Sequence, residues 1–344
     1  MKAVVIGGAG FLGRRMVELL AGEPLDPRWP RYASIHILDT QPLRPVESTR
    51  VAVTSQIGDI REPSDLREAL AGADTVFHAA SVVDVSLSPH PRIEEVNVRG
   101  ARNVVEACVE LGVPRLVYTS SEDVLLCDTP VRGADESAPY PARAIHAYVA
   151  TKIEGEKIAL GADRRGGLRT VSIRPVHIYG PGDPHAIVTS LRAFRDGSVP
   201  FLLGDGSARF DVVYVDNVAH AHFLAAHKLS DPDSVDAVGG RAYFAGEDHA
   251  PNYFDWLRPY AEQKGIRMPT RRLGRRRTHL LASAMELFGR LTRREPTFHR
   301  FHAHVIGEDF FFDHSRAKRE LGYAPIVDKE EALRRTIAWL DSAM

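Results

Sequence analysis

Short apolar runs alternate with amphipathic stretches through the first half of the chain. The runs are nearly continuous in apolar residues and predict strands at 3–6, 34–38, 51–56, 75–78, 115–119 and 170–174. Residues at helical spacing predict helices at 11–21, 64–71, 92–112 and 146–162. Strands that are apolar on both faces lie inside a sheet with helices on each side. The alternation therefore predicts an α/β fold of the Rossmann type, with a doubly wound parallel sheet.

The regular alternation ends near residue 175. A strand at 211–215 and a helix at 216–228 follow, but the other late segments mix short runs with clusters of Gly, Pro and Arg. We therefore predict a larger domain formed by 1–175 plus 211–239. The remaining residues, 176–210 plus 240–344, are predicted to form a smaller C-terminal portion that binds the substrate.

A glycine-rich segment, GGAGFLG at 7–13, lies between the first strand and the first helix. Glycines at such a turn let the backbone approach a pyrophosphate, whose charge then lies at the N-terminus of the helix. Tight turns also use glycine, but the strand–loop–helix context favours dinucleotide binding. The candidate cofactor contacts in this segment are Gly7, Gly10, Phe11, Leu12 and Gly13.

Asp39 ends the second strand, where a carboxylate can accept the ribose hydroxyls of NAD and repel the 2′-phosphate of NADP. The alternative is a turn aspartate, because a Thr-Gln-Pro sequence follows. The nearest arginine is Arg44, so the sequence favours NAD and makes the larger domain the NAD-binding one.

Further cofactor contacts are expected after the third and fourth strands. Asp59 and Ile60 are candidates to lie beside the adenine, although Asp59 can equally be a turn or N-cap residue. Ala79 and Ala80 are small, so the cofactor can lie close to the end of the fourth strand.

Tyr148 and Lys152 are four residues apart on a predicted helix and therefore share one face. A lysine cation and an oxidised nicotinamide nearby favour the phenolate and lower the tyrosine pKa from about 10, which suits a base. The sequence Thr119-Ser120-Ser121 ends the fifth strand, at the sheet edge where parallel sheets bind ligands. A surface Tyr–Lys pair and strand-end capping serines are the alternatives.

The motifs GGAGFLG, HAA, YTSS, YVATK and RPVHIYGPGD, in this order, resemble those of the extended short-chain dehydrogenase/reductase superfamily. The resemblance implies that Ser121 rather than Ser120 is catalytic, and that Asn97 supports the site. It implies a homodimer through helices 92–112 and 146–162. It also implies contacts with the nicotinamide end of the cofactor from Thr119, Tyr148, Lys152, Pro175 and Val176.

Segments 168–183, 209–229, 240–259 and 309–325 are similar to the 3β-hydroxysteroid dehydrogenase branch, which includes the sterol-4α-carboxylate 3-dehydrogenases. This similarity implies NAD-dependent oxidation of a 3β-hydroxyl on a sterol or steroid to the ketone. A 4α-carboxysterol would give a β-keto acid, which readily loses CO₂. In this scheme Tyr148 takes the hydroxyl proton, Ser121 holds the oxygen and Lys152 orients the ribose.

Three other functions remain open at this point. A nucleotide-sugar epimerase or dehydratase uses the same Ser, Tyr and Lys, and Arg209 is compatible with a diphosphate. A reductase of another ketone, such as a β-keto acid, would also carry these residues. A non-catalytic NAD-binding regulator usually lacks the tyrosine or the lysine, and both are present here.

Residues 267–294 contain nine arginines and one acidic residue, Glu286. Within this stretch 278–292 has apolar residues at helical spacing, which permits three roles: contact with an anionic membrane, a lid over a steroid-sized pocket, or a core helix. The net charge of the chain is -1 and no nucleic-acid-reading module is present, so nucleic acid is not an expected partner.

Cys108 and Cys127 are expected to be buried free thiols. The fifteen histidines include His299, His302 and His304, but no Cys or carboxylate cluster accompanies them at a ligand spacing, so no metal is expected. The sequence shows no signal-peptide pattern and no membrane-spanning run. We expect a cytoplasmic protein, membrane-associated if 278–292 contacts lipid.

Overall fold

A seven-stranded parallel sheet forms the centre of the computed structural model, which describes residues 1–46, 50–184, 186–296 and 298–344. The strand order is β11-β7-β5-β4-β1-β2-β3. The strands are β1 (Lys2–Ile6), β2 (Ser34–Asp39), β3 (Ala52–Ile57), β4 (Thr75–His78), β5 (Arg115–Thr119), β7 (Arg169–Pro175) and β11 (Arg241–Ala245). The predicted doubly wound parallel sheet is confirmed. Its order reverses between β1 and β4, which opens a crevice at their carboxyl ends.

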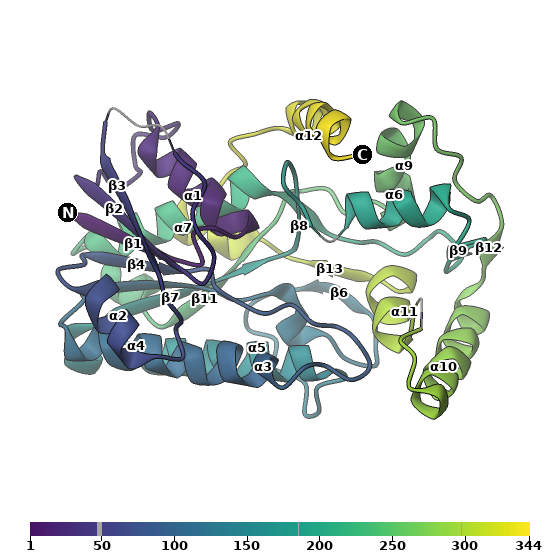
Figure 1. The fold of residues 1–344 in the computed structure, drawn as a ribbon, viewed down its shortest axis with the longest axis horizontal. Coiled ribbons are helices and arrows are strands. Elements are labelled where there is room, and N and C mark those ends of the chain that lie inside the picture. Colours follow the sequence, from purple (N-terminus) through teal and green to yellow (C-terminus); the bar gives the residue numbers. More distant parts are fainter. Residues whose placement is uncertain (47–49, 185, 297) are drawn as a thin grey trace.

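Helices cover both faces of this sheet, as Figure 1 shows. One layer holds α1 (Phe11–Ala21) and α7 (Val215–Ser230), and the other holds α2 (Pro63–Leu70), α4 (Ala101–Glu110) and α5 (Ala147–Gly161). The inner strands are apolar on both sides because both sides are covered: residues 3–6 of β1 are completely buried.

The predicted helix at 92–112 is interrupted near its start. It consists of α3 (Arg92–Glu94), the π-helical turn η1 (Glu95–Gly100) and α4. The wide turn carries Asn97 and packs closely on α5, where a Cβ on Gly155 would lie 2.7 Å from the Asn97 carbonyl oxygen. Such turns are frequent at functional sites.

The boundary that the sequence placed at residue 240 needs correction. Residues Arg241–Ala245 form β11, which pairs with β7 in the large sheet. The predicted strand at 211–215 exists as β10 (Val212–Tyr214), but it pairs with β8 (His177–Tyr179) in a separate two-stranded sheet. The apolar composition of both segments indicates a buried strand without indicating which sheet it joins.

The smaller portion lies beside one end of the large sheet (Figure 1). Its helices are α6 (Ile187–Arg195), α9 (Tyr253–Gln263), α10 (Arg275–Thr292) and α11 (Arg300–Gly307). Two further strand pairs join distant segments: β6 (Val131–Ala134) with β13 (Phe310–Phe312), and β9 (Leu202–Leu203) with β12 (Arg272–Leu273). The remaining short and C-terminal elements are η2 (Glu122–Leu125), η3 (Arg165–Gly167), α8 (Val235–Val238), η4 (Ala317–Leu321) and α12 (Lys329–Ala343).

Both cysteines are free. Cys108 is buried in the core, as expected, and burial raises the pKa of its thiol. Cys127 is only half-buried, so the expectation of burial was wrong for this residue.

A buried ion pair joins α5 to β7. The Glu156 carboxylate, which is fully buried, lies 2.8 Å from Nη2 of Arg174 and also accepts hydrogen bonds from Ser172 and Tyr140. Burial opposes ionisation, but the arginine charge and these hydrogen bonds outweigh it and hold the pKa of Glu156 below its usual value. The stabilisation is therefore complete at neutral pH and is lost as the pH falls through that lowered pKa.

Replacing Glu156 by alanine should lower the free energy of unfolding by about 3–5 kcal/mol, because Arg174 would remain buried without its counter-charge. Urea unfolding near neutral pH measures this change. Glu154→Ala is the matched control, since Glu154 is exposed on the same helix and should change stability by less than about 0.5 kcal/mol. Equal losses in the two variants would contradict the assignment.

Candidate active site

The glycine loop closes tightly against the end of β4. Gly7 has a φ of +83°, and a Cβ there would lie 2.6 Å from the backbone nitrogen of Ala80. A Cβ on Gly13 would overlap the carbonyl oxygen of Gly7, so only glycine lets α1 begin this close to the loop. This close approach brings the N-terminus of α1 to the crevice between β1 and β4.

A cavity of about 250 Å³ lies in this crevice. Its lining includes seven of the predicted cofactor residues: Gly7, Gly10, Asp39, Asp59, Ile60, Ala79 and Ala80. It also includes residues that the sequence analysis did not single out, among them Thr40, Gln41, Val82, Arg92 and Val96. Arg92 is the first residue of the predicted helix 92–112, where an arginine carries no particular signal of a binding site.

The Asp39 carboxylate faces the glycine loop. It accepts hydrogen bonds from the backbone N–H groups of Ala9 and Gln41, each at 2.9 Å. The loop, the helix N-terminus and this carboxylate together fit the pyrophosphate and ribose of a dinucleotide. Asp59 is different, because its carboxylate accepts hydrogen bonds from the side chain and backbone of Arg61. This geometry is that of a turn aspartate, the alternative to an adenine contact that the sequence left open for Asp59.

Five further predicted cofactor residues, Phe11, Leu12, Gly13, Pro175 and Val176, are not in the cavity lining. Phe11, Leu12 and Gly13 form the first turn of α1. Pro175 ends β7, and Val176 follows it, completely buried. Both groups lie at the carboxyl-end edge of the sheet, the first beside the glycine loop and the second at the end of β7.

Lys152 and Tyr148 are both buried on one face of α5. Nζ of Lys152 donates a hydrogen bond of 2.8 Å to the carbonyl oxygen of Thr119, at the end of β5. Burial lowers the pKa of Lys152 to about 8, although the nearby carboxylates of Glu156 and Asp123 oppose this. The ammonium is thus held at a fixed place beside the crevice.

The expected lowering of the tyrosine pKa is not produced by the protein groups. Burial, and then the charge of Asp123, raise the pKa of Tyr148 above its usual value, while a hydrogen bond with Ser121 opposes this. Ser121 caps η2, the turn that packs on α5, so its hydroxyl lies on the side of the site that holds Tyr148. The hydroxyl of Ser120 is buried with no hydrogen-bond partner among the described residues.

Asp123 is a neighbour of this pair that the sequence analysis missed. The Ser121 hydroxyl donates a hydrogen bond of 2.9 Å to the Asp123 carboxylate and accepts one of 3.2 Å from the Asp123 backbone N–H. The available signal was the acidic pair Glu122-Asp123 directly after the serines, at a sheet edge where a buried carboxylate is unusual.

Asn97 joins the segment after β4 to the catalytic helix. Its Oδ1 accepts from the Val82 N–H at 2.8 Å and from the Ser81 hydroxyl at 3.1 Å. Its Nδ2 donates to the Val82 carbonyl at 2.9 Å and to the Thr151 hydroxyl at 3.1 Å. The side chain thus has a supporting position, between the cofactor crevice and α5.

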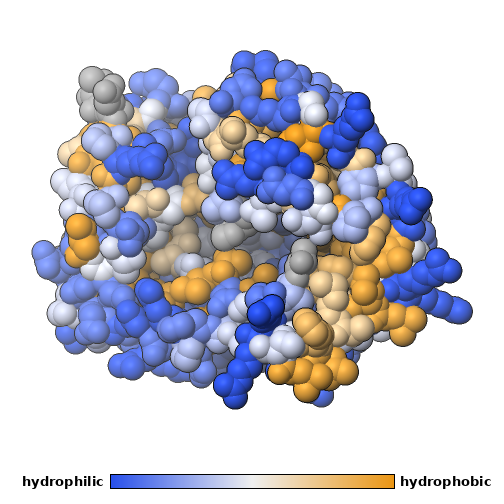
Figure 2. Space-filling model, turned by 45° about the vertical axis from the view of Figure 1, so that its right-hand side comes forward, coloured by the Kyte–Doolittle hydropathy of each residue, from blue (hydrophilic) through white to orange (hydrophobic). Residues whose placement is uncertain are grey.

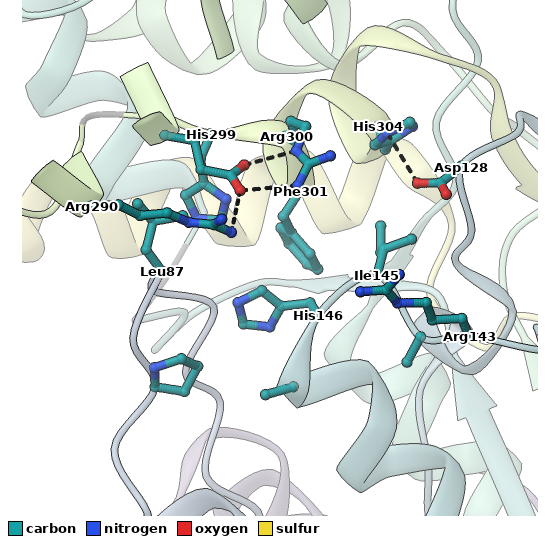
Figure 3. A pocket seen from close by; sticks show the side chains of 14 residues that line it. Leu87, Asp128, Arg143, Ile145, His146, Arg290, His299, Arg300, Phe301 and His304 are labelled. Carbon is teal, nitrogen blue, oxygen red and sulfur yellow. Dashed lines mark hydrogen bonds and ion pairs between the residues drawn. The ribbon is translucent and has the colours of Figure 1, made fainter. Parts of the chain in front are cut away.

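A second cavity, of about 290 Å³, lies between α5 and the pair α10–α11 (Figure 3). His146 lies at its centre, where its ring faces Phe301. Nδ1 of His146 accepts a hydrogen bond from the Tyr148 N–H, and its Nε2 lies 2.9 Å from the carbonyl oxygen of Ser86. Nε2 of His299 lies 2.7 Å from the carbonyl oxygen of Val85. The loop after β4 is therefore tied to both α5 and α11.

His177, on β8, packs against Phe210, Tyr253 and Trp256. Within the described ranges, no group of three histidine, cysteine or acidic residues is placed to hold a metal ion. The guanidinium carbon of Arg209 lies 3.9 Å from the centre of the Phe311 ring, so the arginine stacks on that ring.

Helix α10 turns four of its large apolar side chains outward, while Leu281 and Met285 are half-buried. Its buried stripe consists of Thr278, Ala282, Glu286 and Gly289. The exposed fractions of the outward side chains are 72% for Leu280, 60% for Leu287, 63% for Phe288 and 76% for Leu291. The interpretation of 278–292 as a core helix is therefore wrong. Apolar residues also gather at the lower right of Figure 2, on the part of the molecule that holds α10.

Replacing Asp39 by alanine should weaken NAD binding about tenfold and leave NADP binding equal or stronger, because the carboxylate that binds ribose and repels a 2′-phosphate is lost. Titration calorimetry with both dinucleotides measures the ratio. Asp39→Asn keeps an acceptor for the Ala9 N–H and should change the ratio in the same direction. An unchanged NAD/NADP ratio in both variants would remove Asp39 from this role.

The sequence matches known proteins over nearly its full length. The model of the 3-beta hydroxysteroid dehydrogenase/isomerase family matches residues 4–275. The chain is 36% identical to 3beta-hydroxysteroid-dehydrogenase/decarboxylase isoform 1 of Arabidopsis thaliana, over 97% of this chain and 78% of the relative. It is 32% identical to the decarboxylating sterol-4-alpha-carboxylate 3-dehydrogenase of Mus musculus, over 98% and 90%.

A bacterial relative carries a different name. The 2-alkyl-3-oxoalkanoate reductase of Shewanella oneidensis is 32% identical, over 98% of this chain and 86% of its own length. These matches confirm the resemblance that the glycine loop, the YTSS and the YVATK motifs indicate. The chain belongs to the 3-beta hydroxysteroid dehydrogenase/isomerase family, within the extended short-chain dehydrogenases/reductases.

Proposed function

We propose that this protein is an NAD-dependent dehydrogenase that oxidises the 3β-hydroxyl of a sterol or steroid-like substrate to the ketone. The observation that carries the proposal is the placement of Tyr148 and Lys152, both buried on the part of α5 that packs on η2, the turn that Ser121 caps. Lys152 is bonded there to the end of β5. Family membership and the names of the relatives support the substrate class.

Each group has a separate role in this proposal. NAD, when bound, accepts the hydride from the carbinol carbon, and its positive ring favours the phenolate of Tyr148. Tyr148 accepts the hydroxyl proton, Ser121 holds the substrate oxygen, and Lys152 orients the nicotinamide ribose. Asn97 keeps the cofactor-side loop and α5 in register.

A 4α-carboxysterol is the substrate in which oxidation leads to decarboxylation. Its 3-ketone is a β-keto acid, in which the carbonyl accepts the electron pair of the breaking C–C bond as an enolate. No further protein group is needed for CO₂ to leave. The decarboxylase names of the relatives in Arabidopsis and mouse support this substrate.

Reduction of a 2-alkyl-3-oxo acid is the second candidate, because the Shewanella relative matches this chain nearly as well. The same tyrosine then donates the proton, and the reaction runs from ketone to alcohol. The two candidates share the β-keto acid arrangement and differ in direction and in the size of the apolar group.

The exposed face of α10 is proposed to contact an anionic membrane surface. Leu280, Leu287, Phe288 and Leu291 are exposed apolar residues of this helix, and exposed arginines lie at both of its ends: Arg276, Arg277, Arg293 and Arg294. The opposite side of α10 contributes Glu286 and Arg290 to the second cavity, so the helix also covers that cavity. No helix among the described residues is long and apolar enough to cross a membrane. The homodimer stays a prediction.

NADH formation should appear when the protein is given NAD with a 3β-hydroxysteroid or a 4α-carboxysterol, and CO₂ should be released only from the latter. A UDP-sugar and a 2-alkyl-3-oxo acid with NADH complete the panel. Tyr148→Phe should lower the turnover rate at least about a hundredfold, which is the usual contribution of a positioned acid or base. The variant should still bind NAD. Turnover of the UDP-sugar alone, or full activity of Tyr148→Phe, would contradict the proposal.

Replacing Leu287, Phe288 and Leu291 together by serine should weaken binding to phosphatidylserine-containing vesicles about tenfold or more, since each buried apolar side chain contributes about 1.5–3 kcal/mol. Vesicle co-sedimentation at low and high salt measures this, and pure phosphatidylcholine vesicles should bind less. Leu25→Ser with Ile57→Ser is the matched control, because both are exposed apolar residues far from α10 in sequence. Equal binding by the control and the α10 variant would contradict the membrane contact.

A further inference from the structure

The hydrogen bonds of Ser121 are almost fully assigned within the protein. A serine hydroxyl has one proton to donate and two lone pairs that can accept. Its proton points to the Asp123 carboxylate at 2.9 Å, and one lone pair receives the Asp123 backbone N–H at 3.2 Å. One lone pair remains, on the side of Tyr148 and the crevice, so Ser121 faces a substrate as a hydrogen-bond acceptor.

This state suits an alcohol better than a ketone. An alcohol oxygen carries a proton that it can donate to Ser121, whereas a ketone oxygen only accepts. The Tyr148 phenol can donate one hydrogen bond to a ketone oxygen. A second donor becomes available when Asp123 is protonated, because the carboxyl can then donate to Ser121 and release the serine proton toward the crevice. The protonation of Asp123 thus reverses the direction of the hydrogen bond that Ser121 offers.

We propose that Asp123 is a positioning residue that sets, through Ser121, whether the site binds the alcohol or the ketone form of the substrate. The inference rests on the proposed function and concerns its direction. Nothing in it requires Asp123 to touch the substrate.

The groups around Asp123 keep the pKa of its carboxyl within the pH range in which the binding of alcohol and ketone can be measured. Burial raises the pKa of Asp123 to about 6, while the hydrogen bond from Ser121 and the charge of Lys152 lower it. Tyr148 and Lys152 face it from α5, and Glu122 on its own turn is buried with a strongly raised pKa. The alcohol form is therefore favoured above this pKa, and the ketone form below it.

The test compares the binding of a 3β-hydroxysteroid with NAD and of the matching 3-ketosteroid with NADH, from about pH 5 to about pH 7.5. In the unmodified protein the ratio of ketone to alcohol affinity should rise about tenfold toward low pH, the factor that one hydrogen bond contributes. Asp123→Ala and Asp123→Asn should have a ratio that does not change with pH. Asp123→Glu should restore part of the change.

Glu122→Gln is the matched control, because it removes the neighbouring buried carboxyl and should keep the pH-dependent ratio. A purely structural role of Asp123 would weaken both ligands equally and leave the pH dependence in place, which would overturn the proposal. The same holds if Glu122→Gln, rather than the Asp123 variants, abolishes the dependence.

A second measurement needs no substrate, so it separates this inference from the proposed function. In protein labelled with ¹³C at the aspartate carboxyl, the resonance that Asp123→Asn removes should titrate near pH 6. Its pKa should rise in Ser121→Ala and in Lys152→Met, because each variant loses an interaction that favours the carboxylate. An Asp123 resonance unaffected by Ser121→Ala would overturn the proposal, whichever substrate the enzyme takes.

Discussion

The buried charges of α5 are the constraint on which the active site depends. Tyr148, Lys152 and Glu156 follow one another at intervals of four residues, so the phenol, the ammonium and the carboxylate form a row on one face of the helix. Glu156 is held by Arg174 on β7, and Lys152 is held by the carbonyl oxygen of Thr119 on β5. Two neighbouring strands thus fix the height and rotation of the helix that presents the tyrosine.

The row of Tyr148, Lys152 and Glu156 also bears on the ionisation of the Lys152 ammonium. Burial alone disfavours the ammonium, while the carboxylates of Glu156 and Asp123 on either side favour it. Glu156 is itself neutralised by Arg174, so it contributes less than an unpaired carboxylate would. The cation is therefore retained by several partial interactions, and the position of α5 and the ionisation of its lysine depend on each other.

Much of the fold and part of the site could be predicted from the sequence. The strands at the centre of the sheet are apolar on both faces, and GGAGFLG can be interpreted from local geometry alone, because Gly7 and Gly13 have no room for a Cβ. The place of β11 could not be predicted, since an apolar run does not specify its neighbour. Asp123 was missed for a similar reason: its significance comes from the Ser121 hydroxyl and from burial, which the sequence does not show.

In helix α10 the amphipathic pattern of the sequence does not indicate which face of the helix packs on the protein. Periodicity identifies an apolar face but not what covers it, and here the protein covers the stripe of Thr278, Ala282, Glu286 and Gly289 instead. The buried Glu286 pairs with Arg290 and Arg300, so the protein side of the helix is attached to α11 by charge. Glu286 and Arg290 of this helix line the second cavity together with His146 and Ala147, at the start of α5. The polar positions that accompany the apolar face therefore mark the side of the helix that the fold uses.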